Sequence, residues 1–342
     1  MSELIIGGKQ IAPGSTKQIE LPVVRLYTDT DISMPVHVIR AKKDGPTVFV
    51  SAAIHGDEIN GVEIVRRLIK LKSFKLSRGS LIMVPLVNVY GMLSQTRYMP
   101  DRRDLNRCFP GSSKGSLAGI VARSFMSEIV EHCDYGIDLH TGAIHRSNLP
   151  QIRANLDDKE TLELAEAFGV PVLLNSNLRD GSLRQAATEV GCKVLLYEAG
   201  EALRFDELAI RAGVRGVQQV LYQLGMVRRR RTSKVTPYIA NTSSWTRAAA
   251  SGIVTNLKNM GDQVAKGEPL ARIGSPLGET FATVEASRSG IIIGKQNIPL
   301  VQQGDAMFHI AYFSDMDEEI ADNIQSMSDT LLPTREGGAT QE

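Results

Sequence analysis

The sequence has few cysteines, almost no net charge and no long apolar run, and each absence excludes a class of protein. Its 342 residues include three cysteines, Cys108, Cys133 and Cys192, an odd number without CxxC spacing. This usage is typical of free thiols in a reducing compartment. The formal net charge is +1, so no global field would attract nucleic acid or an anionic membrane. No stretch approaches ~20 consecutive apolar residues. We therefore expect no membrane span, no nucleic-acid partner and a small-molecule substrate.

The beginning of the chain also lacks a targeting signal. Residues 1–8 contain an acid and two glycines, and they have no charged start followed by an apolar core. This composition predicts that there is no signal peptide. Together with the free thiols it favours a cytoplasmic protein, and it leaves homo-oligomerisation open.

The rest of the composition is that of a globular chain with room for two domains, with 42% apolar and 23% charged residues. Over the first 200 residues, β-rich runs alternate with runs whose apolar residues recur at helical spacing. The expected elements are a hairpin over 21–40, strands at 47–54, 80–87, 170–174 and 193–198 and into Asp138, and helices near 62–71, 117–132, 158–168 and 182–190. This alternation predicts an α/β fold with a mixed, mostly parallel central sheet flanked by helices. In such sheets, ligands bind beyond the carboxyl ends of the strands.

The composition changes after residue 225, where helix signals give way to strand and turn signals. We predict a catalytic domain over residues 1–235, which includes the N-terminal hairpin, a C-terminal β domain over 236–315 and an acidic tail over 316–342. The arginine run 228–231 lacks interleaved aromatic residues, so a solvated linker or helix end is favoured over an anion-binding patch. The tail is expected to form a short helix followed by a frayed end.

The C-terminal segment resembles the small β-barrel of biotinyl and lipoyl domains. The resemblance rests on residues 251–270 and on a shorter echo at 289–292 and 303–307, where glycines suit tight hairpin turns. A carrier domain needs a modifiable lysine at its hairpin tip, and there is no lysine between Gly274 and Ser289. We therefore expect the barrel fold without the carrier function.

Two short motifs carry metal-binding chemistry. His55-Gly56-Asp57-Glu58 follows the apolar run 47–54, and Asp138-Leu139-His140 arrives downstream. Together they offer two imidazole nitrogens and a carboxylate, the three protein ligands of a catalytic zinc site that keeps its fourth position for water. Either Asp57 or Glu58 could supply the carboxylate. The motifs predict a metallohydrolase.

Two further segments make the pattern specific. Asp104-Leu105-Asn106-Arg107-Cys108-Phe109-Pro110-Gly111 lies in the long loop 88–116, and Leu196-Tyr197-Glu198-Ala199-Gly200 lies at a strand end. Four such elements in this order resemble the succinylglutamate desuccinylase/aspartoacylase family, a branch of the zinc carboxypeptidase-like hydrolases, over nearly the whole chain. The resemblance implies a zinc carboxypeptidase-like catalytic domain and hydrolysis of the amide of a small N-acyl amino acid or related compound.

The resemblance also assigns roles to individual residues. It implies that His55, Glu58 and His140 hold one Zn²⁺ per chain and that Glu198 is the general acid and base. It implies that Arg97 stabilises the oxyanion.

Asn106 and Arg107 match the pair that holds a substrate carboxylate, and Asp138 could orient a ligand histidine as an outer partner or serve only as a strand-end turn residue.

Some alternatives stay open at this level. Arg102 or Arg103 could replace Arg97 if the loop alignment slips, and Glu201 is a weaker rival of Glu198. A Cys108 nucleophile is disfavoured because no histidine base is evident nearby. Other functions to weigh are a carboxypeptidase or amidase acting on peptides or cell-wall fragments, and a metal-free binding module built around the β domain. The acyl group, the amine, and whether the β domain caps the active site also stay open.

Overall fold

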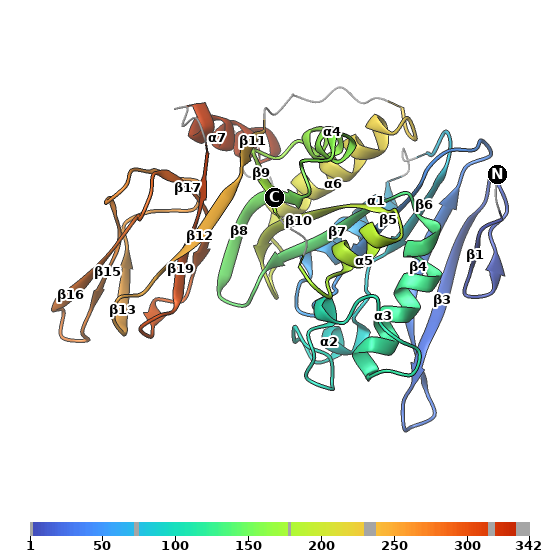
Figure 1. Ribbon diagram of the computed structural model, residues 1–342, viewed down its shortest axis with the longest axis horizontal. Helices are drawn as coiled ribbons and strands as arrows, with labels where there is room; N and C mark the ends of the chain where they lie inside the picture. Colours follow the sequence, from blue (N-terminus) through green and yellow to red (C-terminus); the bar gives the residue numbers. More distant parts are fainter. Residues whose placement is uncertain (1–2, 72–74, 177–178, 229–236, 314–318, 333–342) are drawn as a thin grey trace, which may run out of the picture.

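A long mixed β-sheet runs through the molecule in the computed structural model, which describes residues 3–71, 75–176, 179–228, 237–313 and 319–332 (Figure 1). Its strands, in spatial order, are β12 (Thr242–Arg247), β19 (Ala306–Tyr312), β17 (Gly290–Gln296), β8 (Arg146–Ala154), β10 (Lys193–Glu201), β7 (Tyr135–Gly142), β5 (Thr47–Ala52), β6 (Ser80–Val84), β4 (Asp31–Arg40) and β3 (Thr16–Arg25). Three more strands attach beside this path: β9 (Val172–Asn175), β11 (Tyr238–Ala240) and β14 (Gln263–Val264).

The sheet is parallel at its centre and antiparallel toward its sides. β6, β5, β7 and β10 pair in parallel, as β8, β9 and β11 do. β4 pairs antiparallel with β6 and β3, and β8 lies antiparallel between β10 and β17. The expected α/β fold with a mixed sheet is confirmed, and parallel pairing is found in the two groups β6–β5–β7–β10 and β8–β9–β11.

Helices cover both faces of this sheet. One face carries α1 (Asn60–Lys70), α4 (Lys159–Phe168) and α6 (Glu207–Gln223), and the other carries α3 (Leu117–Glu128) and α5 (Leu183–Glu189). α1 buries Ile64 and Leu68 against the sheet, as its apolar spacing predicts. Ser116, Asp158 and Ser182 precede α3, α4 and α5 and accept hydrogen bonds from their first turns, which explains where these helices begin.

Several elements lie outside this sheet and the helices that cover it. They are β1 (Ile5–Ile6), β2 (Lys9–Gln10), α2 (Val89–Leu93), the 3₁₀ turns η1 (Leu105–Arg107) and η2 (Val130–His132), and α7 (Glu319–Leu331). α7 confirms the helix expected in the acidic tail. Of the helices that the structure describes, none has the length and apolar character that a membrane crossing needs.

The C-terminal strands form two layers around a shared core. β16 (Thr280–Glu285), β15 (Pro269–Gly274), β13 (Gly252–Asn256) and β18 (Leu300–Val301) make a second sheet. The core between this sheet and β17 and β19 includes Leu270, Ile273, Phe308 and Ile310. The inner layer continues the central sheet through β17 and β8, so the expected separate, closed barrel is not confirmed. The domain division at residue 235 stays a prediction, because residues 229–236 lie outside the described part.

Candidate metal centre and its pocket

The loop after β5 is built around glycine and a strained turn. Ala53 has a φ of 52°, in the left-handed region, and its carbonyl accepts a hydrogen bond from the Asn88 amide. A Cβ placed on Gly56 would lie 2.0 Å from the carbonyl carbon of Gly91, so only glycine fits there. The turn then closes with the Glu58 amide donating to the His55 carbonyl. His55 and Glu58 therefore point to the same side of the loop.

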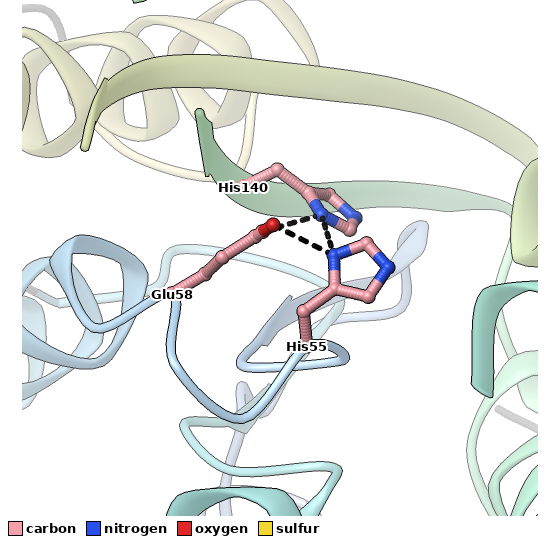
Figure 2. A group of neighbouring side chains, drawn as sticks. All are labelled: His55, Glu58 and His140. Carbon is pink, nitrogen blue, oxygen red and sulfur yellow. Dashed lines mark hydrogen bonds and ion pairs between the residues drawn. The ribbon is translucent and has the colours of Figure 1, made fainter. Parts of the chain in front are cut away.

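His140 completes the group from the neighbouring strand (Figure 2). β7 runs parallel to β5, with Ala52 opposite Leu139, so His140 lies level with the loop that carries His55. The distance from His55 Nδ1 to Glu58 Oε1 is 2.8 Å, and from His140 Nδ1 to Glu58 Oε2 it is also 2.8 Å. The two Nδ1 atoms are 3.2 Å apart. All three side chains are buried and could together hold a metal ion.

The outer nitrogens of both histidines face carboxylates. His140 Nε2 lies 2.7 Å from Asp138 Oδ2, and His55 Nε2 lies 3.2 Å from Asp104 Oδ1. The second oxygen of Asp138 accepts a hydrogen bond from Ser51 Oγ. Because a carboxylate only accepts, each Nε2 can donate a proton to its outer carboxylate, and with a metal ion bound each Nδ1 would turn a lone pair toward the centre of the group.

This donor set fits a divalent cation. The two Nδ1 atoms and the Glu58 carboxylate converge, and a cation that displaces the protons between them would be bound by two imidazole lone pairs and a carboxylate oxygen. Two ligands of a tetrahedral Zn²⁺ with bonds of about 2.0–2.1 Å lie about 3.3 Å apart. The two Nδ1 atoms, 3.2 Å apart, are close to this separation, and the two contacts with Glu58, at 2.8 Å, are shorter.

The electrostatics also favour positive charge at this point. Burial opposes ionisation of Glu58, yet the charges of His55 and His140 outweigh it and lower the pKa of this carboxyl far below its ordinary value. Burial likewise favours neutral His140, but Asp138 and Glu58 raise the pKa of this imidazole. The carboxylates of Glu58 and Asp138 thus favour positive charge between them, which a proton on His140 or a metal cation could supply.

Arg97 borders the group, whereas its two sequence rivals do not. Its NH1 lies 3.4 Å from Glu58 Oε1 and its NH2 lies 2.9 Å from Asp104 Oδ2. Arg102 and Arg103 are exposed, and Arg103 faces Asp101 at 3.8 Å.

Asp104 joins Arg97 to His55. Burial raises the pKa of the Asp104 carboxyl, but the hydrogen bonds and charges of His55 and Arg97 outweigh this and hold it well below its usual range. Asp104 also accepts a hydrogen bond from the Asn106 amide, which starts η1.

Glu198 approaches the group from β10. Its partner across the parallel β10–β7 pair is His140. One oxygen, Oε2, accepts a hydrogen bond from Asn148 Nδ2 at 2.5 Å and lies 3.4 Å from Arg153 NH2. The rival Glu201 is buried away from the pocket, where it accepts hydrogen bonds from the His145 amide and Asn297.

A cavity of about 280 Å³ opens beside these residues, and arginine dominates its wall. The arginines that line it are Arg97, Arg107, Arg146, Arg153, Arg179 and Arg184, against the carboxylates Glu58 and Glu198. Burial lowers the pKa of Arg184 to about 10, with Arg153 and Arg179 adding like charge. Such a wall attracts anions.

Asn106 and Arg107 line the cavity as well. Asn106 Oδ1 already accepts a hydrogen bond from the Leu183 amide at 2.9 Å, which leaves its NH₂ group as a donor. Burial lowers the pKa of the Arg107 guanidinium, and the nearby Arg179 and Arg97 act in the same direction.

Two alternatives from the sequence do not join the group. Asp57 is buried, and its Oδ1 has no hydrogen-bond partner among the described residues, but it lies outside the His55–Glu58–His140 group. Cys108 donates its thiol to the Asp104 carbonyl, and burial raises the pKa of this thiol, so it lacks the character of an activated nucleophile.

Several residues of the site were not foreseen from the sequence. Those without an expected role are Asp104, Arg146, Asn148, Arg153, Arg179, Arg184 and Trp245. Only Asp104 could have been found from the sequence, because it is the first residue of the loop motif 104–111 and lies two residues before Asn106. The strand β8, which carries Arg146, Asn148 and Arg153, was not predicted at all.

The fold and the site define a mixed α/β protein with a buried candidate metal group beside a cationic pocket. Residues 44–224 match the model of the succinylglutamate desuccinylase/aspartoacylase catalytic domain, and the chain belongs to this family of deacylases. It is 28% identical over 296 residues to the N-alpha-acetyl-L-2,4-diaminobutyric acid deacetylase of Halomonas elongata, covering 82% of this chain and 86% of the relative.

Solved structures agree with this assignment. A succinylglutamate desuccinylase/aspartoacylase from Rhodobacter sphaeroides has a TM-score of 0.76 and 25% identity, covering 87% of this chain and 96% of that one. The product-bound ectoine utilization protein EutE (DoeB) from Ruegeria pomeroyi has a TM-score of 0.77 and 24% identity, and the match covers 88% of this chain and 97% of that one. The latter likeness supports the fold.

Proposed function

We propose that the protein is a zinc-dependent deacylase that hydrolyses the amide of a small N-acyl amino acid or a related N-acyl compound. The observation that carries the proposal is the convergence of two Nδ1 atoms and one carboxylate, each histidine being held by an outer carboxylate. His55, Glu58 and His140 would hold the ion. When bound, zinc supplies Lewis acidity toward a water molecule and the amide carbonyl.

The neighbouring side chains divide the remaining work. Glu198 takes a proton from the attacking water and later delivers it to the leaving nitrogen, while Arg97 stabilises the negative charge that develops on the amide oxygen. Asn106 and Arg107 bind a carboxylate of the substrate through the free NH₂ group and the guanidinium. Asp138 orients His140.

The lining of the cavity bears on the substrate. A volume of about 280 Å³ suits a small molecule better than a peptide. The arginines favour an N-acyl compound with a second anionic group over one with a side-chain ammonium, such as the substrate that names the Halomonas elongata relative.

Metal content and hydrolysis test the proposal together. Elemental analysis of the purified protein should give about one zinc per chain. A panel of N-acetyl and N-succinyl amino acids should include a compound that is hydrolysed, and chelation should stop the reaction until zinc is returned. Protein without bound zinc, or hydrolysis that survives complete chelation, would overturn the zinc mechanism.

A further inference from the structure

We propose that Asn148 is a positioning residue for Glu198, and that Gly294 of the C-terminal strand β17 keeps Asn148 in place. The inference rests on the proposed function, since it concerns the group that moves the proton. It gives Gly294, which is not among the residues that line the pocket, an indirect part in catalysis.

Asn148 contacts Glu198 directly. Asn148 is buried on β8 and donates Nδ2 to Glu198 Oε2 at 2.5 Å. Arg153 NH2 approaches the same oxygen at 3.4 Å. Within the described part of the chain, Oε1 has no hydrogen-bond partner. One oxygen is therefore fixed by β8, and the other is left to exchange a proton.

An irregularity in β10 allows Asn148 to reach Glu198. The pairing of β10 with β8 shifts between Glu198 and Gly200, and Asn148 lies opposite Gly200. Gly200 has a φ of 74°, which favours glycine. This irregularity brings the side chain of Asn148 toward Glu198, although the two residues are not direct cross-strand partners.

Asn148 also pairs with a residue of the C-terminal region, Gly294. Gly294 pairs with Asn148 on one side and with His309 of β19 on the other. A Cβ on Gly294 would lie 2.9 Å from Asn148 Oδ1 and 3.2 Å from His309 Cβ. A methyl group at position 294 would therefore push the Asn148 amide away from the place where its NH₂ group meets Glu198.

The same edge of the pocket receives a second C-terminal contribution. Trp245 of β12 lines the cavity, and its ring stacks on His309 at 4.8 Å between centroids with 9° between planes. Arg146 lies 5.4 Å from the centre of the same ring. The strands that hold Gly294 thus sit against the site, as the Asn148 inference requires.

The test compares Asn148→Ala, Asn148→Asp and Gly294→Ala with the unmodified protein on the best substrate of the panel. Asn148→Asp keeps the volume but replaces the donor by an acceptor. Both Asn148 variants should lower kcat about 10-fold to 100-fold with KM nearly unchanged and with zinc retained, because a misplaced proton-transfer group affects the transition state. Gly294→Ala should lower kcat in the same way. Gly119→Ala, where an added methyl meets nothing closer than 3.5 Å, is the matched control.

A double variant tests the coupling. If Gly294 acts through Asn148, Gly294→Ala should cost little further kcat in the Asn148→Ala background. Full activity of Asn148→Asp would show a space-filling role and overturn the inference, as would additive losses in the double variant. If Gly294→Ala does not fold, the kinetics of Asn148→Ala and Asn148→Asp still test whether Asn148 positions Glu198. If the unmodified protein hydrolyses no compound of the panel, the proposed function itself is overturned. If the unmodified protein is active and the Asn148 and Gly294 variants are equally active, only the positioning role is overturned.

Discussion

The carboxylate of Asp104 lies between His55 and Arg97, 3.2 Å from Nε2 of the first and 2.9 Å from NH2 of the second. One side chain thereby contacts both the outer nitrogen of a candidate metal ligand and the guanidinium of the candidate oxyanion group. The Asp104 carboxylate also accepts a hydrogen bond from the Asn106 amide at the start of η1, the turn that carries Asn106 and Arg107. The loop motif is therefore a connected unit in which Asp104 is the common partner.

Replacing Asp104 by Asn should weaken both functions. The isosteric amide removes the charge that favours the Nε2–H tautomer and the arginine contact, so zinc affinity and kcat/KM should each fall about 10-fold to 100-fold. Competition with a chelator and steady-state kinetics measure the two losses. Asp101→Asn, in the same loop but facing Arg103 and the start of α3, should leave zinc affinity unchanged. Equal affinity in the Asp104 variant would contradict the role.

Glu198→Gln should abolish turnover while zinc stays bound. The amide keeps the shape of the side chain but cannot accept the proton of the attacking water, so a loss of about 100-fold or more in kcat is expected. Elemental analysis should show an unchanged zinc content. Glu201→Gln is the matched control, since this residue lies three positions on and accepts hydrogen bonds outside the pocket. Retained activity in the Glu198 variant would sink the mechanism.

The sequence predicted those parts of the site that local order determines. His55 and Glu58 are brought together by one turn, and His140 follows from the parallel pairing of two recognisable strands. Asn148 and Trp245 depend on β8 and β12, whose places in the sheet are set by long-range antiparallel pairing. Hydrophobic periodicity identifies a strand but not its neighbours, so these residues could not be assigned.

The helix α6 was also missed, although it has clear local signals. Asp206 accepts a hydrogen bond from the Ala209 amide at its start, and buried residues such as Ile210, Val217 and Val220 recur along one face. The expected sheet was mixed and mostly parallel, and the parallel pairs are found among β6, β5, β7 and β10 and among β8, β9 and β11.

Substrate charge should decide specificity. Among the described residues, no carboxylate pairs with Arg107, Arg146 or Arg179, although all three line the cavity. An N-acyl amino acid with an acidic side chain should therefore have a higher kcat/KM than its diamino counterpart. Arg179→Gln should lower kcat/KM for the acidic substrate about 10-fold or more, with less effect on a neutral one, because a charged hydrogen bond is lost. Arg103→Gln, outside the cavity, is the control. A preference for the diamino compound would contradict this prediction.

His309 should make the fold sensitive to mild acid. It is buried against Trp245, its Nε2 contacts Ser243 Oγ at 2.9 Å and its Nδ1 has no partner in the described part of the chain. Burial, with Arg153 adding like charge, lowers its pKa to about 3. Between that value and the ordinary histidine pKa of about 6.5, the unfolded chain binds more protons than the folded one. The free energy of unfolding should therefore fall as the pH drops below 6.5.

The loss from His309 should reach about 1.4 kcal/mol one pH unit below the ordinary histidine pKa. Replacing His309 by Phe keeps an aromatic ring beside Trp245 and removes the titrating group. Denaturant unfolding at pH 5.5 and pH 8 measures the difference for both proteins. The variant should show a smaller loss of stability between these values, and the pH 8 measurement, where the imidazole is neutral in both states, isolates the cost of the substitution itself. An identical pH dependence in the two proteins would mean that His309 is not the acid-sensitive group.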